Sequence, residues 1–330
     1  MPVPLVSVII PTARRPNLVL RAIGGALDQT MREIEVIVVV DGPDGGTIEA
    51  LATIGDSRLR VIALPASVGA SGARNAGVSE ARAAWIAFLD DDDEWFPRKL
   101  EIQWQTAQRC ACPHPIVSCR LLVRGPEGDL VWPRRTPAPG EPISEYLFCQ
   151  HGLRGGDGLI IPTAILTTRD LLVRVPFRED LPTHNDVDWL LRAATVAGVE
   201  AVFVPNREPL GIWHRDAGRA RIGNTTDWRY SLDWIEGHRG LATPRAYASW
   251  VLTSTSSTAA RGGHWKAFWL LPWVAFAHGK PRPIDLLAHL IVWLVPGRLR
   301  ARLSVWLERR RKWPARRTSG PDPAGRGIVA

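Results

Sequence analysis

The sequence has little that would mark a secreted, membrane-spanning or repetitive protein. Its amino terminus carries no basic flank and no signal-peptide core, because the apolar run from Val3 to Ile10 leads directly into Pro11. The apolar stretches 265–278 and 284–295 are each shorter than the roughly 20 residues that span a bilayer. No segment repeats at a fixed period. We therefore expect a globular protein that remains in the cytoplasm.

Cysteine is scarce, with four residues in 330. In the cytoplasm these thiols are expected to stay reduced. Cys110 and Cys112 lie close to His114 in the sequence, so a zinc site is conceivable. The spacing of these residues matches no common zinc pattern, and we do not predict one.

Basic and acidic residues balance over most of the chain, so the net charge is confined to one end. The protein carries +8, and the segment 296–330 alone holds ten Arg and Lys against two acidic residues. Residues 1–295 therefore sum to zero. The sequence describes a neutral globular body followed by a basic tail.

What the first hundred residues do contain is an alternation of apolar strands and helices. Such alternation predicts an α/β fold with right-handed βαβ units and a parallel sheet. Expected strands are 5–10, 34–40, 59–63 and 85–89, and expected helices are 17–27, 47–53 and 71–84. Further along the chain, we expect an irregular segment over 113–142, a helix within 180–197 and a strand over 199–204.

The most informative feature is a row of four carboxylates, Asp90 to Asp93, directly after the apolar run 85–89. Parallel sheets bind ligands at the carboxyl ends of their strands. Crowded negative charges repel one another unless a cation neutralises them, and carboxylate oxygens suit Mg²⁺ or Mn²⁺. The alternative, from this row alone, is a solvated acidic turn.

Other polar segments are expected at the same sheet edge. The first strand ends in Pro11-Thr12-Ala13-Arg14, and the second ends at Asp41. A Gly- and Ala-rich segment, 68–77, opens the helix that precedes the acidic row. Because parallel strands end at one edge, these segments are expected to converge.

These motifs together resemble the GT-A glycosyltransferases of family 2. The matching segments are Ser7 to Thr12, Val39 to Gly42, Gly69 with Ala73 to Gly77, and Phe88 to Leu100. The resemblance implies a GT-A type α/β fold, with a Rossmann-like, mostly parallel central sheet flanked by helices. It implies a catalytic domain over 1–240, with a nucleotide-sugar half at about 5–112 and an acceptor half at about 113–240. Residues 241–330 are then a Trp-rich, basic helical extension with a disordered tail from about 315.

The resemblance also implies roles for single residues in binding a nucleoside-diphosphate sugar. Asp41 would accept a hydrogen bond from the base, and Arg74 would line the same pocket. Asp91 would bind the ribose, while Asp92, with Asp90 close by, would hold a divalent metal on the diphosphate. The remaining nucleotide-side residues are Pro11, Thr12 and Arg14. From the residues alone, Asp41 could be a turn residue and Arg74 a solvent-facing helix residue.

On the acceptor side, His184 to Arg192 resembles the acidic segment that carries the catalytic base in this family. Asp186 takes the position of the base, and Asn185 replaces the usual Glu. An exposed Asp, with a pKa of about 3.9, is a poor base at neutral pH. Burial or an acidic neighbour such as Asp188 is therefore expected to raise the pKa of Asp186. The alternative is that Asp186 only caps the following helix.

A later segment, Trp213-His214-Arg215, is expected to close over the diphosphate. By the same resemblance, His214 could complete the metal coordination and Arg215 could stabilise charge on the leaving group. A buried histidine that only packs is the alternative interpretation.

The carboxyl-terminal segment 298–313 places Leu299, Leu303, Trp306 and Leu307 at helical spacing among arginines. That pattern is typical of a helix in a membrane interface, attracted to anionic lipid. The alternative is that the apolar stretches pack on the catalytic domain and the arginines are solvated. Nucleic-acid binding is disfavoured, because the aromatics form a helical apolar face.

The sequence therefore predicts a metal-dependent, inverting glycosyltransferase that uses a nucleotide-diphospho-sugar, with a UDP-sugar favoured. The expected acceptor is a hydroxyl of a cell-surface glycan or its lipid-linked precursor, on the inner face of the plasma membrane. Two alternatives stay open. One is an inactive nucleotide-sugar binding module, and the other is a nucleotidyltransferase, which would need a glycine-rich loop after the first strand.

Overall fold

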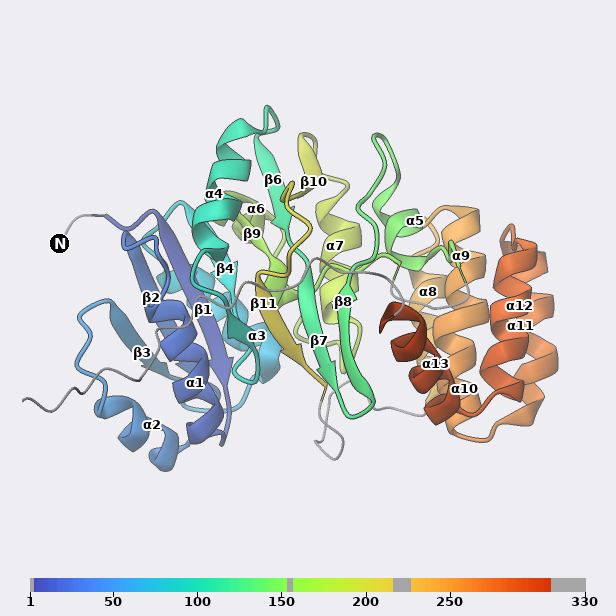
Figure 1. Cartoon of the computed structure of the whole chain (residues 1–330), viewed down its shortest axis with the longest axis horizontal. Helices are drawn as coiled ribbons and strands as arrows, with labels where there is room; N and C mark the ends of the chain where they lie inside the picture. The colour runs from blue at the N-terminus through green and yellow to red at the C-terminus, as the bar shows by residue number, and fades with distance from the viewer. Residues whose placement is uncertain (1–2, 153–156, 216–226, 310–330) are drawn as a thin grey trace, which may run out of the picture.

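The computed structural model describes residues 3–152, 157–215 and 227–309. A seven-stranded sheet forms the central layer, a smaller four-stranded sheet lies beside it, and helices from the carboxyl-terminal third build one end of the molecule (Figure 1). The expected α/β fold with a mostly parallel central sheet and a helical extension is confirmed.

The central sheet has the strand order β10-β6-β9-β4-β1-β2-β3. Only β9 runs antiparallel to its neighbours, and all the other pairs are parallel. The strands are β1 (Val6–Thr12), β2 (Ile34–Val40), β3 (Leu59–Ala63), β4 (Trp85–Phe88), β6 (His114–Ser118), β9 (Leu166–Thr168) and β10 (Val199–Phe203). The carboxyl ends of β1, β2 and β4 therefore meet at one edge, as the sequence predicts.

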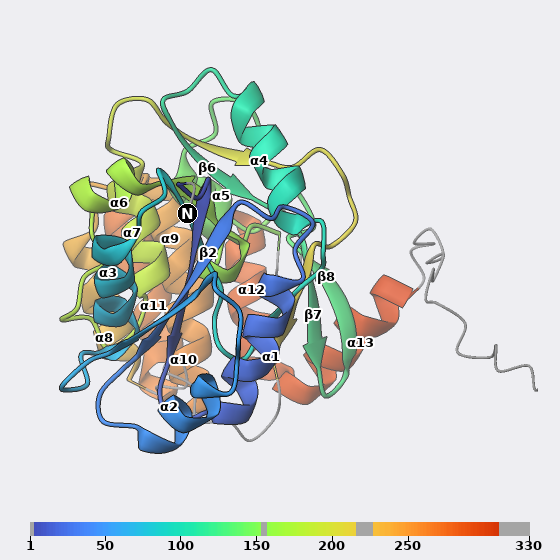
Figure 2. The same ribbon diagram turned by 90° about the vertical axis from the view of Figure 1, so that its left-hand side faces the viewer.

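Helices cover both faces of this sheet. Figure 2 shows α3 on one side of β1 and β2 and α1 on the other. The helices of this part are α1 (Pro16–Leu27), α2 (Gly45–Ala52), α3 (Gly69–Glu80), α4 (Lys99–Arg109), α5 (Ile143–Phe148), α6 (Arg169–Arg174) and α7 (Asn185–Ala193), with a 3-10 turn η1 (Pro162–Ala164). Each face of the sheet has its own buried core, which explains the near-continuous apolar runs of β1 and β2.

Helix α3 packs very closely on β1. A Cβ added at Gly77 would lie 2.5 Å from Cγ2 of Ile9, which is closer than any van der Waals contact allows. Glycine at this position therefore lets the helix approach the strand. That approach brings the amino-terminal half of α3 to the sheet edge where β1 and β4 end.

The expectation of an irregular segment over 113–142 is wrong, because this segment contains three strands, β6, β7 and β8. The second sheet has the order β5-β11-β7-β8. Its strands are β5 (Glu94–Trp95), β7 (Leu121–Gly125), β8 (Gly128–Trp132) and β11 (Gly211–His214). Glycines close the β7–β8 hairpin, where Gly125 pairs with Gly128, so they mark a turn between strands rather than an unstructured segment.

Helix ends also differ slightly from expectation. The helix expected over 71–84 is α3, which ends at Glu80, and the one expected within 180–197 is the shorter α7, Asn185–Ala193. The strand expected over 199–204 is β10 and ends at Phe203.

The carboxyl-terminal helices are α8 (Trp228–Gly237), α9 (Pro244–Trp250), α10 (Ser256–Arg261), α11 (Trp265–His278), α12 (Pro283–Leu294) and α13 (Gly297–Arg309), with a π-helical turn η2 (Val251–Thr255) between α9 and α10. They share a buried core with α5 and α7, in which Phe148 and Leu191 meet Trp234 and Trp250. Among the described residues, no helix has the length and apolarity needed to cross a bilayer. The tail expected from about residue 315 lies outside the described residues.

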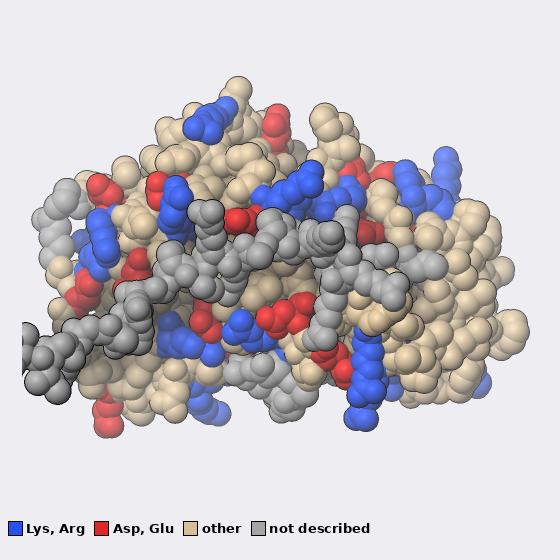
Figure 3. Space-filling view, in the orientation of Figure 1, with Lys and Arg blue, Asp and Glu red and all other residues tan. Residues whose placement is uncertain are grey.

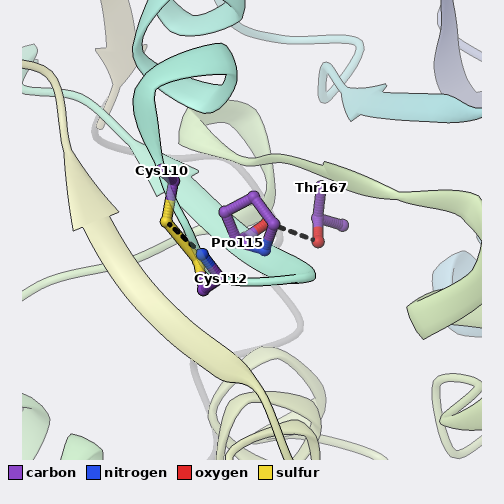
Figure 4. Close-up of a disulfide and its surroundings, with 4 residues drawn as sticks. All are labelled: Cys110, Cys112, Pro115 and Thr167. Carbon is purple, nitrogen blue, oxygen red and sulfur yellow. Dashed lines mark hydrogen bonds between the residues drawn. A yellow bond between two sulfur atoms is a disulfide. The ribbon is translucent and has the colours of Figure 1, made fainter.

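The cysteines differ from the expected four reduced thiols. Cys110 and Cys112 form a disulfide, because the turn between α4 and β6 brings their Cα atoms within 5.4 Å (Figure 4). Cys119 and Cys149 are buried free thiols, and burial raises the pKa of each to about 11.

Candidate active site

The acidic row after β4 is divided between the interior and the edge of the sheet. Asp93 points inward, where its carboxylate accepts hydrogen bonds from the Thr163 hydroxyl (2.6 Å) and the His214 backbone N–H (3.1 Å). Burial, together with the charge of Asp90, raises the pKa of Asp93 well above its usual range. Asp93 therefore joins η1 and β11 to the acidic loop rather than facing a ligand.

Asp91 is the second buried member of the row. Its carboxylate accepts hydrogen bonds from Thr12 Oγ1 (2.8 Å) and from Arg15 Nη1 (3.1 Å). Burial raises the pKa of Asp91 to about 6, although the Thr12 hydroxyl and the Arg15 charge oppose the shift. Arg15 also lies 3.7 Å from a carboxylate oxygen of Asp92. Thr12 and Asp91 are thus brought together as expected, and Arg15 is a site residue that the sequence analysis missed.

Arg74 lies at this edge and not in solvent. Its Nη2 donates to Asp90 Oδ1 at 2.5 Å, and its side chain is only 9% exposed. The guanidinium also sits over the ring of Phe177, 5.6 Å from the centroid. The alternative of a solvent-facing helix residue is therefore wrong for Arg74.

Asp41 organises the loop that leads into α3. Its carboxylate accepts hydrogen bonds from Ser67 Oγ (2.8 Å) and from the backbone N–H groups of Val68 (2.7 Å) and Gly69 (3.0 Å). Gly69 has a φ of +78°, a conformation that favours glycine. Asp41 remains partly exposed beside the end of β1, since its backbone N–H donates to the Thr12 carbonyl (2.8 Å).

The other two nucleotide-side residues border the same edge. Pro11 is buried within β1, paired with Val39 of β2. Arg14 is exposed, with a positive φ of 55°, and its backbone N–H donates to Asp44 Oδ2 (2.6 Å). The loop after β1 is therefore tied to the loop after β2, which leaves the Arg14 side chain facing solvent.

Asp186 approaches this cluster from α7. Burial raises its pKa; the charge of Arg74 opposes the shift and the charge of Asp90 adds to it. Asn185 Nδ2 donates to Ser71 Oγ at 2.7 Å, which joins the start of α7 to the start of α3. The sequence predictions for Asp186, Arg74 and Asp90 thus converge on one region.

Two details around Asp186 bear on the sequence analysis. The N-cap of α7 is His184, and no side chain caps this helix, so the alternative that Asp186 only caps α7 is wrong. Of the two expected causes of a raised Asp186 pKa, burial is the main one. The buried carboxylate of Asp188 is held by Arg192 (2.7 Å) and His238 (2.7 Å).

His214 is buried at the end of β11, beside the acidic row. Its Nε2 lies 2.6 Å from Glu94 Oε1, and Arg21 Nε lies 3.5 Å from the same oxygen. Arg21 Nη2 also donates to the Asp92 carbonyl (2.7 Å). His214 therefore contacts Glu94 and Asp93 directly, while Arg21 links Glu94 to the Asp92 backbone.

The acidic row does not form a closed metal cage by itself. Within the described part of the chain, the one group of three or more potential ligand atoms close together is Cys110, Cys112 and Glu200, and its two sulfurs are joined in the disulfide. The open carboxylate edge instead suits an ion that takes one or two protein oxygens and completes its shell with substrate phosphates.

Comparison with known proteins agrees with this geometry. Residues 7–175 match the model of the family described as "Glycosyl transferase family 2". The chain belongs to this family. The match contains β1 from its second residue, the acidic row and η1, and it ends before α7.

Among curated relatives, the succinoglycan biosynthesis protein ExoO of Rhizobium meliloti is 42% identical over 98 residues, which are 30% of this chain and 28% of ExoO. The amylovoran biosynthesis glycosyltransferase AmsB of Erwinia amylovora is 24% identical over 249 residues, 72% of this chain and 79% of AmsB. The chain spans about a third of the length of several other relatives, which are uncharacterised glycosyltransferases.

Among solved structures, S. aureus TarS 1–349 in complex with UDP-GlcNAc superposes with a TM-score of 0.52 at 15% identity. The match covers 87% of this chain and 90% of that one. This likeness concerns the fold, and confirms the GT-A type architecture of this family 2 chain.

Proposed function

We propose that this family 2 protein is a metal-dependent glycosyltransferase. It transfers a sugar from a nucleotide-diphosphate donor to an acceptor hydroxyl, with inversion at the anomeric carbon. The observation that carries the proposal is the meeting of three elements. The acidic row after β4, Arg74 of α3 and Asp186 of α7 lie within electrostatic reach of one another.

The donor is proposed to lie across the carboxyl ends of β1, β2 and β4. Asp41 and Arg74 flank the base pocket, with Pro11, Thr12 and Arg14 beside the nucleotide. Asp91 would bind the ribose. Because Thr12 and Arg15 already hold the Asp91 carboxylate, its orientation is fixed before the donor arrives.

A divalent ion, Mn²⁺ or Mg²⁺, is proposed on Asp92, with Asp90 nearby. Carboxylate oxygens and substrate phosphates are the ligands such ions prefer, and the ion would neutralise charge on the departing diphosphate. His214 is the second proposed ligand. To bind an ion, its Nε2 would have to exchange the Glu94 carboxylate for the metal.

Asp186 is proposed as the general base that takes the proton from the acceptor hydroxyl. Inversion in one displacement needs the base on the side of the sugar opposite the leaving group. Helix α7 carries Asp186 towards the cluster from outside the acidic loop. The raised pKa of Asp186 brings it nearer to the range in which a carboxylate is an effective base.

A UDP-sugar donor and a lipid-linked glycan acceptor, used at the inner face of the plasma membrane, complete the proposal. They are suggested by relatives such as a UDP-Glc:alpha-D-GlcNAc-diphosphoundecaprenol beta-1,3-glucosyltransferase, WfgD of Escherichia coli, which is 35% identical over 99 residues. That match covers 30% of this chain and 39% of WfgD.

The proposal is tested by screening UDP-, GDP- and dTDP-sugars by thermal shift with Mn²⁺ present, then following hydrolysis of the donor that stabilises most. We expect release of free nucleoside diphosphate, lost on addition of a chelator. Binding without hydrolysis or transfer, in the presence of lipid-linked acceptors, would support the inactive binding module. Release of pyrophosphate from a nucleoside triphosphate and a sugar phosphate would instead identify a nucleotidyltransferase.

A further inference from the structure

The outer side of α11 exposes a stripe of large aromatic residues. Trp265 (59% exposed), Trp269 (78%), Trp273 (65%) and Phe276 (61%) recur every three or four residues, so they lie on one side of the helix. Soluble proteins rarely leave such contiguous apolar surface uncovered. The stripe therefore calls for a partner.

Helix α12 extends this surface with Leu287 (43% exposed), Leu290 (41%) and Leu294 (66%), again at helical spacing. The two helices form one hairpin, in which the rings of Trp265 and Trp293 lie 5.0 Å apart. The opposite side of α11, including Leu271, is buried in the core of the carboxyl-terminal helices. We call the exposed stripes of α11 and α12 together the hairpin face.

The charges around the hairpin face have one sign. Between residues 262 and 307 the sequence has six Lys or Arg and a single acidic residue, Asp285. Asp285 is fully buried and paired with Arg282. Figure 3 shows the corresponding end of the molecule almost free of acidic side chains, with basic side chains at its margins.

A cavity of about 270 Å³ lies at one edge of this face, between α10, α11, α12 and the start of α13. Its lining includes two arginines, Arg261 and Arg300, beside Trp265, Trp293 and Leu294. The Nε of Arg300 is buried without a hydrogen-bond partner. Burial lowers the pKa of both arginines, and the proximity of Arg261 adds to the effect at Arg300. Arg261 already donates hydrogen bonds to Ser257 Oγ and Thr258 Oγ1, so an anionic group in this cavity would chiefly offset the burial of the Arg300 charge.

We propose that the hairpin face docks on an anionic lipid bilayer, and that the cavity between Arg261 and Arg300 receives a lipid phosphate. Tryptophans with an apolar body and a polar edge favour the level of the lipid headgroups. Helix α11 has 14 residues, so its face lies along the surface instead of crossing it.

A second copy of the chain is a poorer occupant. A symmetric interface would place the basic margins of two copies together, and the one acidic residue within 262–307, Asp285, is buried. The sequence-based prediction assigned membrane contact to residues 298–313. In helix α13, Val305 is buried against Val123 and Leu130 of the second sheet, whereas Leu299, Leu303 and Trp306 remain about half exposed, so that prediction stays open beside this proposal.

The test is co-sedimentation of the full chain with vesicles, in the absence of donor and acceptor, so that its outcome is independent of the proposed function. One vesicle is phosphatidylcholine alone, and in the other about a third of the lipid is phosphatidylglycerol. We expect stronger binding to the anionic vesicles. The double variant Trp269→Ala/Trp273→Ala should weaken this binding about tenfold or more, because two large apolar side chains no longer leave water.

Two further variants distinguish phosphate binding in the cavity from a general attraction between basic residues and anionic lipid. Arg300→Gln should weaken binding to anionic vesicles about fivefold, the effect of roughly 1 kcal/mol. Arg109→Gln removes an exposed arginine at the end of α4 and should bind as the wild type does. All variants keep the basic segment 309–317, so any difference arises in the described surface. Melting curves verify that each variant is folded.

Three results would overturn the proposal. These are equal binding to both vesicle types, unchanged binding by the double tryptophan variant, and a wild-type dimer in analytical ultracentrifugation that the same variant dissociates. If Arg300→Gln and Arg109→Gln bind alike, the phosphate cavity is refuted.

Discussion

Two aspartates of α7, two residues apart, should respond in opposite ways to the same change. Asp186 is the proposed base, and the structure raises its pKa. Asp188 is held between Arg192 and His238; burial would raise its pKa, but these two partners outweigh burial and lower it. Replacing each by Asn removes one negative charge at nearly constant volume. The pair therefore separates a catalytic role from a structural one.

For Asp186→Asn, we expect kcat to fall by about 10²- to 10⁴-fold, which corresponds to about 2.7–5.5 kcal/mol of transition-state stabilisation. Stability should be unchanged or higher. A carboxyl whose pKa is raised by folding destabilises the native state when it ionises, at pH values above its unfolded pKa of about 3.9. Asn carries no charge and avoids that cost.

For Asp188→Asn, the loss should be in stability. Removing one member of a buried ion pair costs about 3 kcal/mol, because the partners lose their counter-charge. Since the folded pKa of Asp188 is depressed, its contribution is present above the unfolded pKa and disappears as the pH falls through the folded pKa. The kcat of the folded fraction should change less than tenfold.

The assay combines donor-dependent transfer at saturating substrate with urea unfolding of each variant. In the wild type, kcat/KM should fall at low pH, because only the ionised base is active. The apparent pKa of that fall should lie above the ordinary aspartate pKa of about 3.9. A kcat within threefold of wild type for Asp186→Asn would refute the assignment of the base. Equal destabilisation by both variants would show that Asp186, too, is structural.

Three further predictions follow from contacts of the central sheet and the acidic row. Asp92→Asn should abolish metal-dependent turnover of the donor and leave the melting temperature unchanged; activity that persists with Mn²⁺ would remove the metal assignment. Glu35→Gln should lower the free energy of unfolding at neutral pH by about 2 kcal/mol. Burial of Glu35 is outweighed by hydrogen bonds from Ser7, Arg82 and Arg60, which lower its pKa, so the difference from wild type should shrink as the pH falls through that lowered value. Gly77→Ala should cost about 1–3 kcal/mol through its clash with Ile9, whereas Gly24→Ala, with open space around it, should not destabilise; equal unfolding midpoints would contradict the close packing of α3.

Much of the donor side could be predicted from the sequence, because its determinants are local. Apolar runs that end in Thr12, Asp41 and Asp90 define strands of one parallel sheet, and parallel strands bring their carboxyl ends together. The resemblance to family 2 adds Arg74 and Asp186 to the predicted site. The structure confirms that these residues lie near one another.

The rest depended on contacts between distant parts of the chain. Thr163 hydrogen-bonds to Asp93 across 70 residues, and His214 binds Glu94 across 120, and no local pattern encodes either contact. Arg15 and Arg21 did have a signal in the sequence, since Arg15 is the N-cap residue of α1 and Arg21 lies within α1, the helix that follows the first strand. The segment 113–142 is rich in Pro, Gly and Arg, a composition typical of irregular structure, yet it contains β6, β7 and β8, because its glycines form a turn between strands.

The four-stranded sheet has a consequence for geometry. Strand β5 continues directly from the acidic row, β8 lies at the far end of the sheet, and α13 rests on β8 after leaving the α11–α12 hairpin. The second sheet therefore joins the place where a donor would sit to the part that would touch lipid. With the hairpin resting on a bilayer, the reacting centre would stand at a constant height above it. The enzyme would then select acceptors by length, because only those whose terminal sugar projects far enough from the lipid would reach the reacting centre.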